Sequence, residues 1–196
     1  GWGAGWYEGC MNELANAAKS KGNWAIAHEL GHVNQISPGL KWVSTTEVTN
    51  NVYSVCVRYQ FGRDSMPLEQ EKCNDGNNNN VLGGRFNSYL NYGIIKGEQW
   101  LCQKGQDNMD PSKYPYGGDH FVKLCPLWQL LLYYREIVGG EKRDWYGDVA
   151  EIVRNTDESQ LTNGQLQLNF MRNTMDVVKE DLTDFFIKAG MLKPID

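Results

Sequence analysis

The sequence predicts a mainly α-helical protein with a single domain. Several segments are rich in helix-forming residues, apolar residues recur three or four positions apart, and residues that cap or stop helices bound these segments. A chain of 196 residues is long enough to bury one good hydrophobic core. No internal repeat and no linker divides it, so we expect one domain over residues 1–196.

The first two predicted helices precede Pro38. Residues Met11–Ser20 are good helix formers, and Gly22 ends the segment. Asn23 can cap a second helix, which runs from Trp24 to about Gln35 and stops before the proline.

A third helix is predicted from about Ser44 to Phe61. β-branched residues make a strand the alternative, but the apolar period is nearer 3.6 than 2, which favours a helix. The residues that show this spacing are Val48, Val52, Val55 and Tyr59. After it, Cys73–Asn80 (CNDGNNNN) is predicted to be a turn-rich loop. Residues Gly83–Asp119 are broken by Gly, Asn and Pro, with one helix near Phe86–Tyr92.

The last part of the chain is predicted to contain four helices. Asp119 can cap a long apolar helix, His120–Val138, which Gly139 and Gly140 end. Its apolar stripe is expected in the core: Phe121, Leu124, Trp128, Leu131 and Leu132. The three shorter helices are Trp145–Arg154, Leu166–Met175 and Asp181–Ala189.

Composition excludes several classes of protein. With 41% hydrophobic and 22% charged residues, the chain resembles an ordinary globular protein. Its net charge of −5, without a basic run, argues against a nucleic-acid partner. The longest apolar stretch, FVKLCPLWQLLLYY, is too short and interrupted for a transmembrane segment, and no signal peptide opens the chain. Five cysteines without a C-x-x-C pair predict neither a thiolate zinc site nor a disulfide framework.

The stretch AHELGHVNQ, residues 27–35, places an H-E-x-x-H motif on the second predicted helix. His28 and His32 are four positions apart, so they share a helix face and can bind one tetrahedral Zn²⁺. Glu29 can take a proton from a zinc-bound water without binding the metal itself. The alternative is an amphipathic helix with two packing or surface histidines. Because the chain has only three histidines, two of them in this motif favour zinc.

The third ligand decides the class of zinc site. The extended H-E-x-x-H-x-x-G-x-x-H pattern needs a glycine at position 35 and a histidine at position 38, where this chain has Gln35 and Pro38. The sequence instead supplies Glu47, fifteen residues after His32 and early on the third predicted helix. An antiparallel return of the chain would bring Glu47 to the metal. The alternative is a solvated glutamate in a first helical turn.

These residues resemble a known family. The segments AHELGHVNQ, TEVTNNVYS, GGDHFVKLCPLWQLLLYYRE and DLTDFFIKAGML are similar, in this order, to the enhancin-like, mucin-degrading metallopeptidases (metallopeptidase family sixty). The resemblance implies a zincin-like catalytic region of the gluzincin type, in which a glutamate helix follows the H-E-x-x-H helix. It implies zinc bound by His28, His32 and Glu47, with Glu29 as the general base. It also implies secretion or display at a bacterial cell surface, and glycoprotein substrates such as mucins.

Two further residues gain a role from this resemblance. Gluzincins often carry an aspartate one turn after the ligand glutamate, where it accepts the N–H of a zinc histidine. Asn51 stands there and can accept the same bond, or else serve as a cap or face solvent. His120 could donate to the oxyanion, a role that gluzincins give to a downstream His or Tyr. A histidine in the first turn after an aspartate cap is the ordinary alternative.

The chain departs from the family at its beginning. Family members carry substantial sequence before the motif helix, whereas about two dozen residues precede it here. We therefore expect the C-terminal portion of a larger catalytic domain. The seven tryptophans could stack on sugar rings, with GWGAGWY as the best local candidate, but packing is the commoner role of aromatic residues.

The sequence thus predicts a zinc-dependent endopeptidase that cuts O-glycosylated, mucin-like glycoproteins. One alternative is a general gluzincin peptidase or aminopeptidase without glycan preference, although no acidic cluster that would bind a free amine is found. The other is a non-catalytic glycan-binding module with a relict zinc site. The intact Glu29 argues against that module, because a binding protein needs no general base.

Overall fold

The structure, a computed structural model, describes residues 24–42, 45–62, 68, 73–74, 80–81, 84–95 and 120–192. Helices dominate this part of the chain, so the prediction of a mainly α protein is confirmed. None of these helices has the length and hydropathy that a bilayer crossing requires. The predicted helix Met11–Ser20, the segment GWGAGWY and the cap Asp119 lie outside the described residues.

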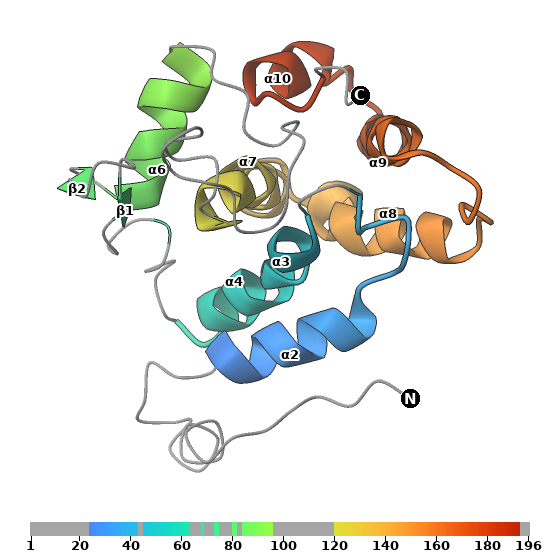
Figure 1. The fold of residues 1–196 in the computed structure, drawn as a ribbon, viewed down its shortest axis with the longest axis horizontal. Helices are drawn as coiled ribbons and strands as arrows, with labels where there is room; N and C mark the ends of the chain where they lie inside the picture. The colour runs from blue at the N-terminus through green and yellow to red at the C-terminus, as the bar shows by residue number, and fades with distance from the viewer. Residues whose placement is uncertain are drawn as a thin grey trace.

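The helix that carries the H-E-x-x-H motif is the first half of a helical hairpin. Helix α2 covers Trp24–Asn34, and the chain returns along it through α3 (Thr46–Thr49) and α4 (Asn51–Gln60) (Figure 1). Asn50, between α3 and α4, has helical dihedrals of φ −63° and ψ −36°. The prediction of a helix rather than a strand in this segment is therefore confirmed.

Helix α7 (His120–Leu132) lies near the centre of the molecule, with the other helices around it (Figure 1). It continues as the π-helix η2 (Tyr133–Val138) and stops at Gly139, whose φ of 68° suits glycine. The expected length and end of this helix are thus confirmed. Its predicted stripe belongs to the core: Leu124, Trp128 and Leu131 are buried, and Phe121 and Leu132 pack against them.

The helices after α7 close the other side of the core. A 3₁₀ turn, η3 (Gly140–Asp144), leads into α8 (Trp145–Arg154), which has the predicted bounds. Helices α9 (Asn163–Val178) and α10 (Thr183–Lys188) follow. Large side chains from α8, α9 and α10 are buried in one cluster with those of α7 and with Trp42, which lies between α2 and α3: Trp145, Phe170, Met171 and Phe186.

The predicted bounds of two helices near the end of the chain were wrong. Helix α9 starts one turn before Leu166 because Thr162 and Gln165 form a capping box, in which Gln165 Oε1 accepts the Thr162 N–H at 2.9 Å. It runs on to Val178 and ends where Lys179 adopts a left-handed φ of 56°. Asp181 lies before α10 rather than in it, since its carboxylate accepts the Thr183 N–H at 2.9 Å.

The segment between α4 and α7 also differs from its prediction. The flanks of the expected loop Cys73–Asn80 form a short antiparallel ladder, β1 (Cys73–Asn74) with β2 (Asn80–Val81). The helix expected near Phe86–Tyr92 is present but longer, as α6 (Gly84–Ser88) followed by the π-helix η1 (Tyr89–Ile95). Pairing across a turn depends on residues six to eight positions apart, which single-residue propensities do not register.

Candidate metal centre

Helix α2 presents His28 and His32 side by side on the face that meets α3 and α4. The two rings lie 4.8 Å apart between centroids and nearly perpendicular, at 86°. Both side chains are about one-quarter exposed, so they remain reachable from solvent. The i, i+4 spacing of a helix accounts for this arrangement.

Gly31, inside the motif, allows the two helices to approach this closely. A β-carbon built on it would lie 2.3 Å from the backbone oxygen of Asn50, which is far inside van der Waals contact. The backbone of the α3–α4 junction therefore occupies the space that any larger residue would need. The glycine sets the distance between the histidines and the returning chain.

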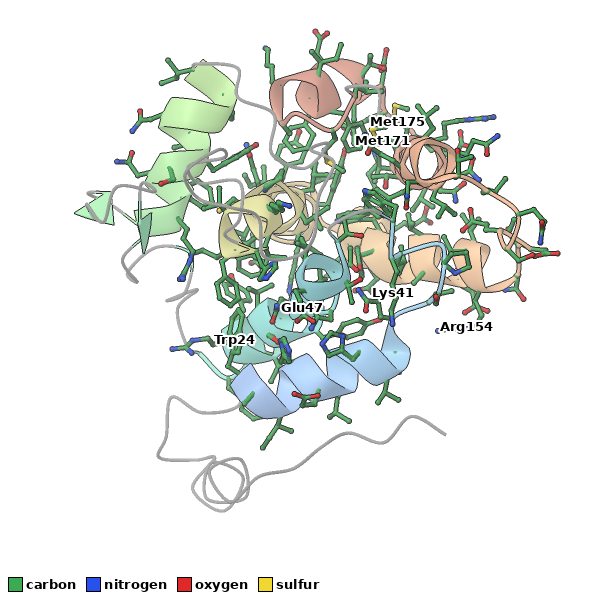
Figure 2. All side chains as sticks on the ribbon, viewed as in Figure 1. Trp24, Lys41, Glu47, Arg154, Met171 and Met175 are labelled. Carbon is green, nitrogen blue, oxygen red and sulfur yellow. The ribbon has the colours of Figure 1, made fainter. Side chains whose placement is uncertain are left out.

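Glu47 reaches the two histidines from the first turn of α3. Its Oε2 lies 3.4 Å from His28 Nε2 and 3.3 Å from His32 Nε2. In Figure 2, Glu47 lies between α3 and the helix that carries the histidines. The three side chains form a group whose ligand atoms all lie within 4.8 Å of one another. The antiparallel return expected from the sequence is therefore present.

These separations suit a tetrahedral metal ion. Zinc bonds of roughly 2.0–2.1 Å at tetrahedral angles place neighbouring ligand atoms about 3.3–3.4 Å apart. The distances from the single Glu47 oxygen to the two imidazole nitrogens, 3.4 and 3.3 Å, match that edge. Two imidazoles and a carboxylate are also a donor set that zinc prefers. The residues present fit a zinc ion.

Asn51 contacts the ring of His28 at Nδ1, the nitrogen that does not face Glu47. Its Oδ1 lies 3.0 Å from His28 Nδ1, and its Nδ2 donates to the Glu47 carbonyl oxygen at 2.8 Å. The Ser54 hydroxyl donates to the same Oδ1 at 3.1 Å. An amide oxygen only accepts, so it fixes the proton on Nδ1 and leaves the Nε2 lone pair directed at Glu47. Asn51 is buried, which rules out the solvent-facing alternative.

Residues 4–190 match the family model for peptidase M60, enhancin and enhancin-like. The chain belongs to this family. The resemblance of the sequence to the enhancin-like peptidase family is thereby confirmed. A peptidase family of this kind implies a metal ion and a protein substrate.

A solved structure of a metallopeptidase from Bacteroides thetaiotaomicron has a similar fold, with a TM-score of 0.63 and 24% sequence identity. The match covers 94% of this M60 chain and 27% of that chain. The M60 chain thus spans about a quarter of the length of that relative. The comparison of the M60 chain with curated protein sequences found no match.

The two predicted catalytic residues lie in different environments. Glu29 follows His28 on α2, is partly exposed, and makes no hydrogen bond or ion pair with the described residues. Its carboxylate is therefore available to a water molecule. His120 begins α7 and is half-buried, but it is not part of the metal-ligand group. A catalytic role for either residue stays a prediction.

Two polar residues near the candidate metal centre were not singled out from the sequence. Gln35 donates through Nε2 to the Thr46 carbonyl oxygen at 2.9 Å and also to the Thr49 hydroxyl, which ties the end of α2 to α3. Asn50 is fully buried, with its Nδ2 3.0 Å from His32 Nε2. Both are ordinary polar residues in sequence, and nothing local distinguishes them from exposed ones.

The other side of α4 borders an apolar cavity of about 240 Å³, between α4, α7 and α8. Aromatic side chains form much of its wall: Tyr53, Tyr59, Trp128 and Tyr146. None of the three predicted metal ligands lines this cavity. The predicted metal ligands of this M60 chain therefore lie at the surface between α2 and α3, not in the cavity.

Proposed function

We propose that this chain is part of the catalytic domain of a zinc-dependent endopeptidase that cuts O-glycosylated, mucin-like glycoproteins. The observation that carries the proposal is the convergence of His28, His32 and Glu47 at tetrahedral-edge distances beside an uncommitted Glu29. A packing pair of histidines would have no need of a carboxylate placed equally close to both Nε2 atoms. The intact Glu29 favours a catalyst over a glycan-binding module.

In this proposal, separate residues bind the metal and transfer the proton. His28 and His32 would bind zinc through Nε2, and Glu47 through its carboxylate oxygen. Zinc, when bound, supplies a Lewis acid that polarises the scissile carbonyl and acidifies water. Glu29 would take a proton from the attacking water and pass it to the leaving amine nitrogen. Asn51 would keep the His28 ring in the orientation and tautomer that bind metal.

The glycoprotein substrate and the location of the protein are supported by the family alone. Enhancin-like peptidases that degrade mucins act outside the cell, so we propose an extracellular or bacterial cell-surface location. Since this chain spans about a quarter of its solved relative, further parts of the protein would contribute to the substrate cleft. The general gluzincin peptidase without glycan preference is the competing function.

The experiment compares a mucin-type glycopeptide with its bare peptide, using the full-length zinc-loaded protein. A site that hydrogen-bonds sugar hydroxyls leaves its polar groups unpaired when the glycan is absent, so we expect kcat/KM for the bare peptide to be lower by orders of magnitude. Equal rates would leave a general peptidase. If neither peptide is cut while zinc is bound, the glycan-binding module is the better description.

A further inference from the structure

The apolar cavity between α4, α7 and α8 is separate from the candidate metal centre, and the proposed peptidase chemistry does not use it. Its floor consists of side chains that are no more than 7% exposed: Val52, Trp128, Leu131, Tyr146 and Ala150. Exposed residues around the start of α8 form its rim: Arg143, Asp144 and Gly147. The cavity is therefore closed on the side of the core and opens to solvent beside the start of α8.

The walls of this cavity favour an aromatic occupant. Tyr59 and Trp128 pack edge to face with 5.5 Å between ring centroids, and Tyr53 and Tyr146 do so at 6.5 Å. Cys56 adds to the apolar wall, since burial raises the pKa of its thiol to about 11 and keeps it neutral at neutral pH. Rings in such arrangements offer both faces and edges, which another flat ring can contact with favourable geometry.

The volume of the cavity limits the size of the occupant. An apolar cavity of about 150 Å³ in another protein holds benzene. The present cavity is larger, at about 240 Å³, but smaller than the roughly 300–1,000 Å³ of pockets for drug-sized ligands. A molecule with two fused rings lies between these limits.

The charges around the opening favour an acidic group on that molecule. Arg143 is exposed and makes no hydrogen bond or ion pair with residues in the described part of the chain. Arg135 also lines the cavity, but its guanidinium is shared between Gln60 Oε1 at 2.7 Å and Glu136 Oε1 at 3.3 Å. Asp144 is the acidic residue at the rim, so two arginines against one aspartate leave an excess of positive charge.

Gly147 leaves the opening free of a side chain. It lies inside α8, where glycine is a poor helix former. A β-carbon at this position would meet no atom of the described residues within 4 Å, and its φ is not in the left-handed region. Neither packing nor backbone conformation therefore requires a glycine here. Its position on the exposed side of the cavity wall gives a ligand access to the rings.

We propose that this cavity is a binding site for a small aromatic acid. The rings of the ligand would lie against Trp128 and Tyr146, and its carboxylate would stay at the rim beside Arg143. A carboxylate in that place keeps part of its hydration, so the ligand avoids the cost of burying a charge. The site is additional to the proposed peptidase activity and does not depend on zinc.

The first test measures the binding of 2-naphthoate to the purified protein by isothermal titration calorimetry. The neutral 2-naphthylmethanol has nearly the same shape and serves as the matched probe. We expect the acid to bind more tightly than the alcohol. Arg143→Gln should weaken binding of the acid roughly two- to fivefold, as for an exposed ion pair, and leave the alcohol unchanged.

Two results of this titration would contradict the proposal. If neither probe binds at millimolar concentration, the cavity is not a site for a small aromatic molecule. If the alcohol binds as tightly as the acid, an uncharged occupant, such as an apolar side chain of another protein segment, is the better description.

The second test locates the binding site. Gly147→Leu places a side chain at the opening, and we expect the affinity for 2-naphthoate to fall at least about fivefold, as in an overfilled cavity. The control, Asp148→Leu, adds the same side chain at the next exposed position of α8, which does not line the cavity, and should bind at least as tightly as the parent. Parent-like binding by Gly147→Leu, or an equal loss in both variants, would overturn the assignment of the site.

Circular dichroism shows whether these variants are folded. If Gly147→Leu does not fold, Cys56→Met narrows the cavity from the side of α4 with a flexible side chain that adapts to its surroundings. The same loss of affinity for 2-naphthoate is expected. Unchanged affinity in a folded Cys56→Met variant would contradict binding in this cavity.

Discussion

At the scale of single residues, the predicted metal ligands contact neighbouring side chains, whereas Glu29 does not. His28 is fixed by Asn51, His32 faces Asn50, and both approach one oxygen of Glu47. Glu29, in contrast, has no hydrogen-bond or ion-pair partner among the described residues. This difference is what the proposed chemistry requires, because ligands must be preorganised whereas a proton carrier must reach both water and the leaving group.

Glu29→Gln in the full-length protein should therefore separate hydrolysis from metal binding. The amide keeps the shape of the side chain but cannot take a proton, so we expect kcat to fall by roughly 10²–10⁴-fold. Zinc content, measured by metal analysis, should stay near one ion per protein. His28→Ala is the matched control, in which zinc should be lost together with activity. A Glu29→Gln variant that keeps most of its kcat would show that another group activates the water.

At the scale of elements, the site is a property of the hairpin between α2 and the α3–α4 segment. Gly31 fits against the Asn50 backbone, and Gln35 ties the end of α2 to α3. The Tyr146 hydroxyl of α8 donates to the Thr49 carbonyl oxygen at 3.4 Å, which links the hairpin to the core. The relative position of two helices, rather than one helix, therefore sets the distances between the ligands.

Gly31→Ala should push these helices apart. The added methyl group would meet a backbone oxygen at 2.3 Å, and backbone cannot move aside as the end of a side chain can. We expect a loss of about 1–3 kcal/mol in the free energy of unfolding, together with weaker zinc binding. Chemical denaturation and chelator competition would measure the two effects.

Gly147 provides the control for this substitution. It lies inside α8, and a β-carbon there would meet nothing within 4 Å. Gly147→Ala should therefore stabilise the chain by about 0.4–1 kcal/mol, since alanine has the better helix propensity. If both variants behaved alike, close packing of α2 on the α3–α4 junction would not be what Gly31 provides.

At the scale of the whole molecule, a polar cluster joins segments that are distant in the chain. The Tyr134 hydroxyl donates to Glu180 Oε2 at 2.9 Å, and Lys142 Nζ lies 2.5 Å from Glu180 Oε1. These contacts connect η2 and η3 with the residues that follow α9. The hydrogen bonds from Lys142 and then from Tyr134 lower the pKa of Glu180 below its ordinary value.

The lowered pKa gives the stability of the fold a defined dependence on pH. A carboxyl group with a depressed pKa in the folded state adds stability above its unfolded pKa, about 4.3 for glutamate, and loses it as pH falls through the folded value. We expect Tm of the parent to exceed that of Glu180→Gln at neutral pH, with the difference shrinking below about pH 4.3. Parallel curves of Tm against pH would show that the cluster adds nothing through charge.

Local sequence determined the helices and the donor residues. The i, i+4 spacing of His28 and His32, the glycines that end α7, and the absence of a third histidine at position 38 are all properties of short segments. Helical geometry acts over one turn, so such patterns can be read without knowing the fold. The start of α9 also depends on a local feature, the capping box of Thr162 and Gln165. The apolar pattern alone did not predict it.

Only the tertiary structure decided how the donors meet. From the sequence, Glu47 could be a ligand or a solvated glutamate in a first helical turn, and only the return of the chain along α2 brings it to the histidines. No local signal marked Asn50 or Gln35 as buried. The need for glycine at position 31 likewise appears only when the Asn50 carbonyl is seen against it. These contacts join residues more than ten positions apart. Their distances depend on how two helices pack, and packing is set by the shape of the whole core rather than by the periodicity of either helix.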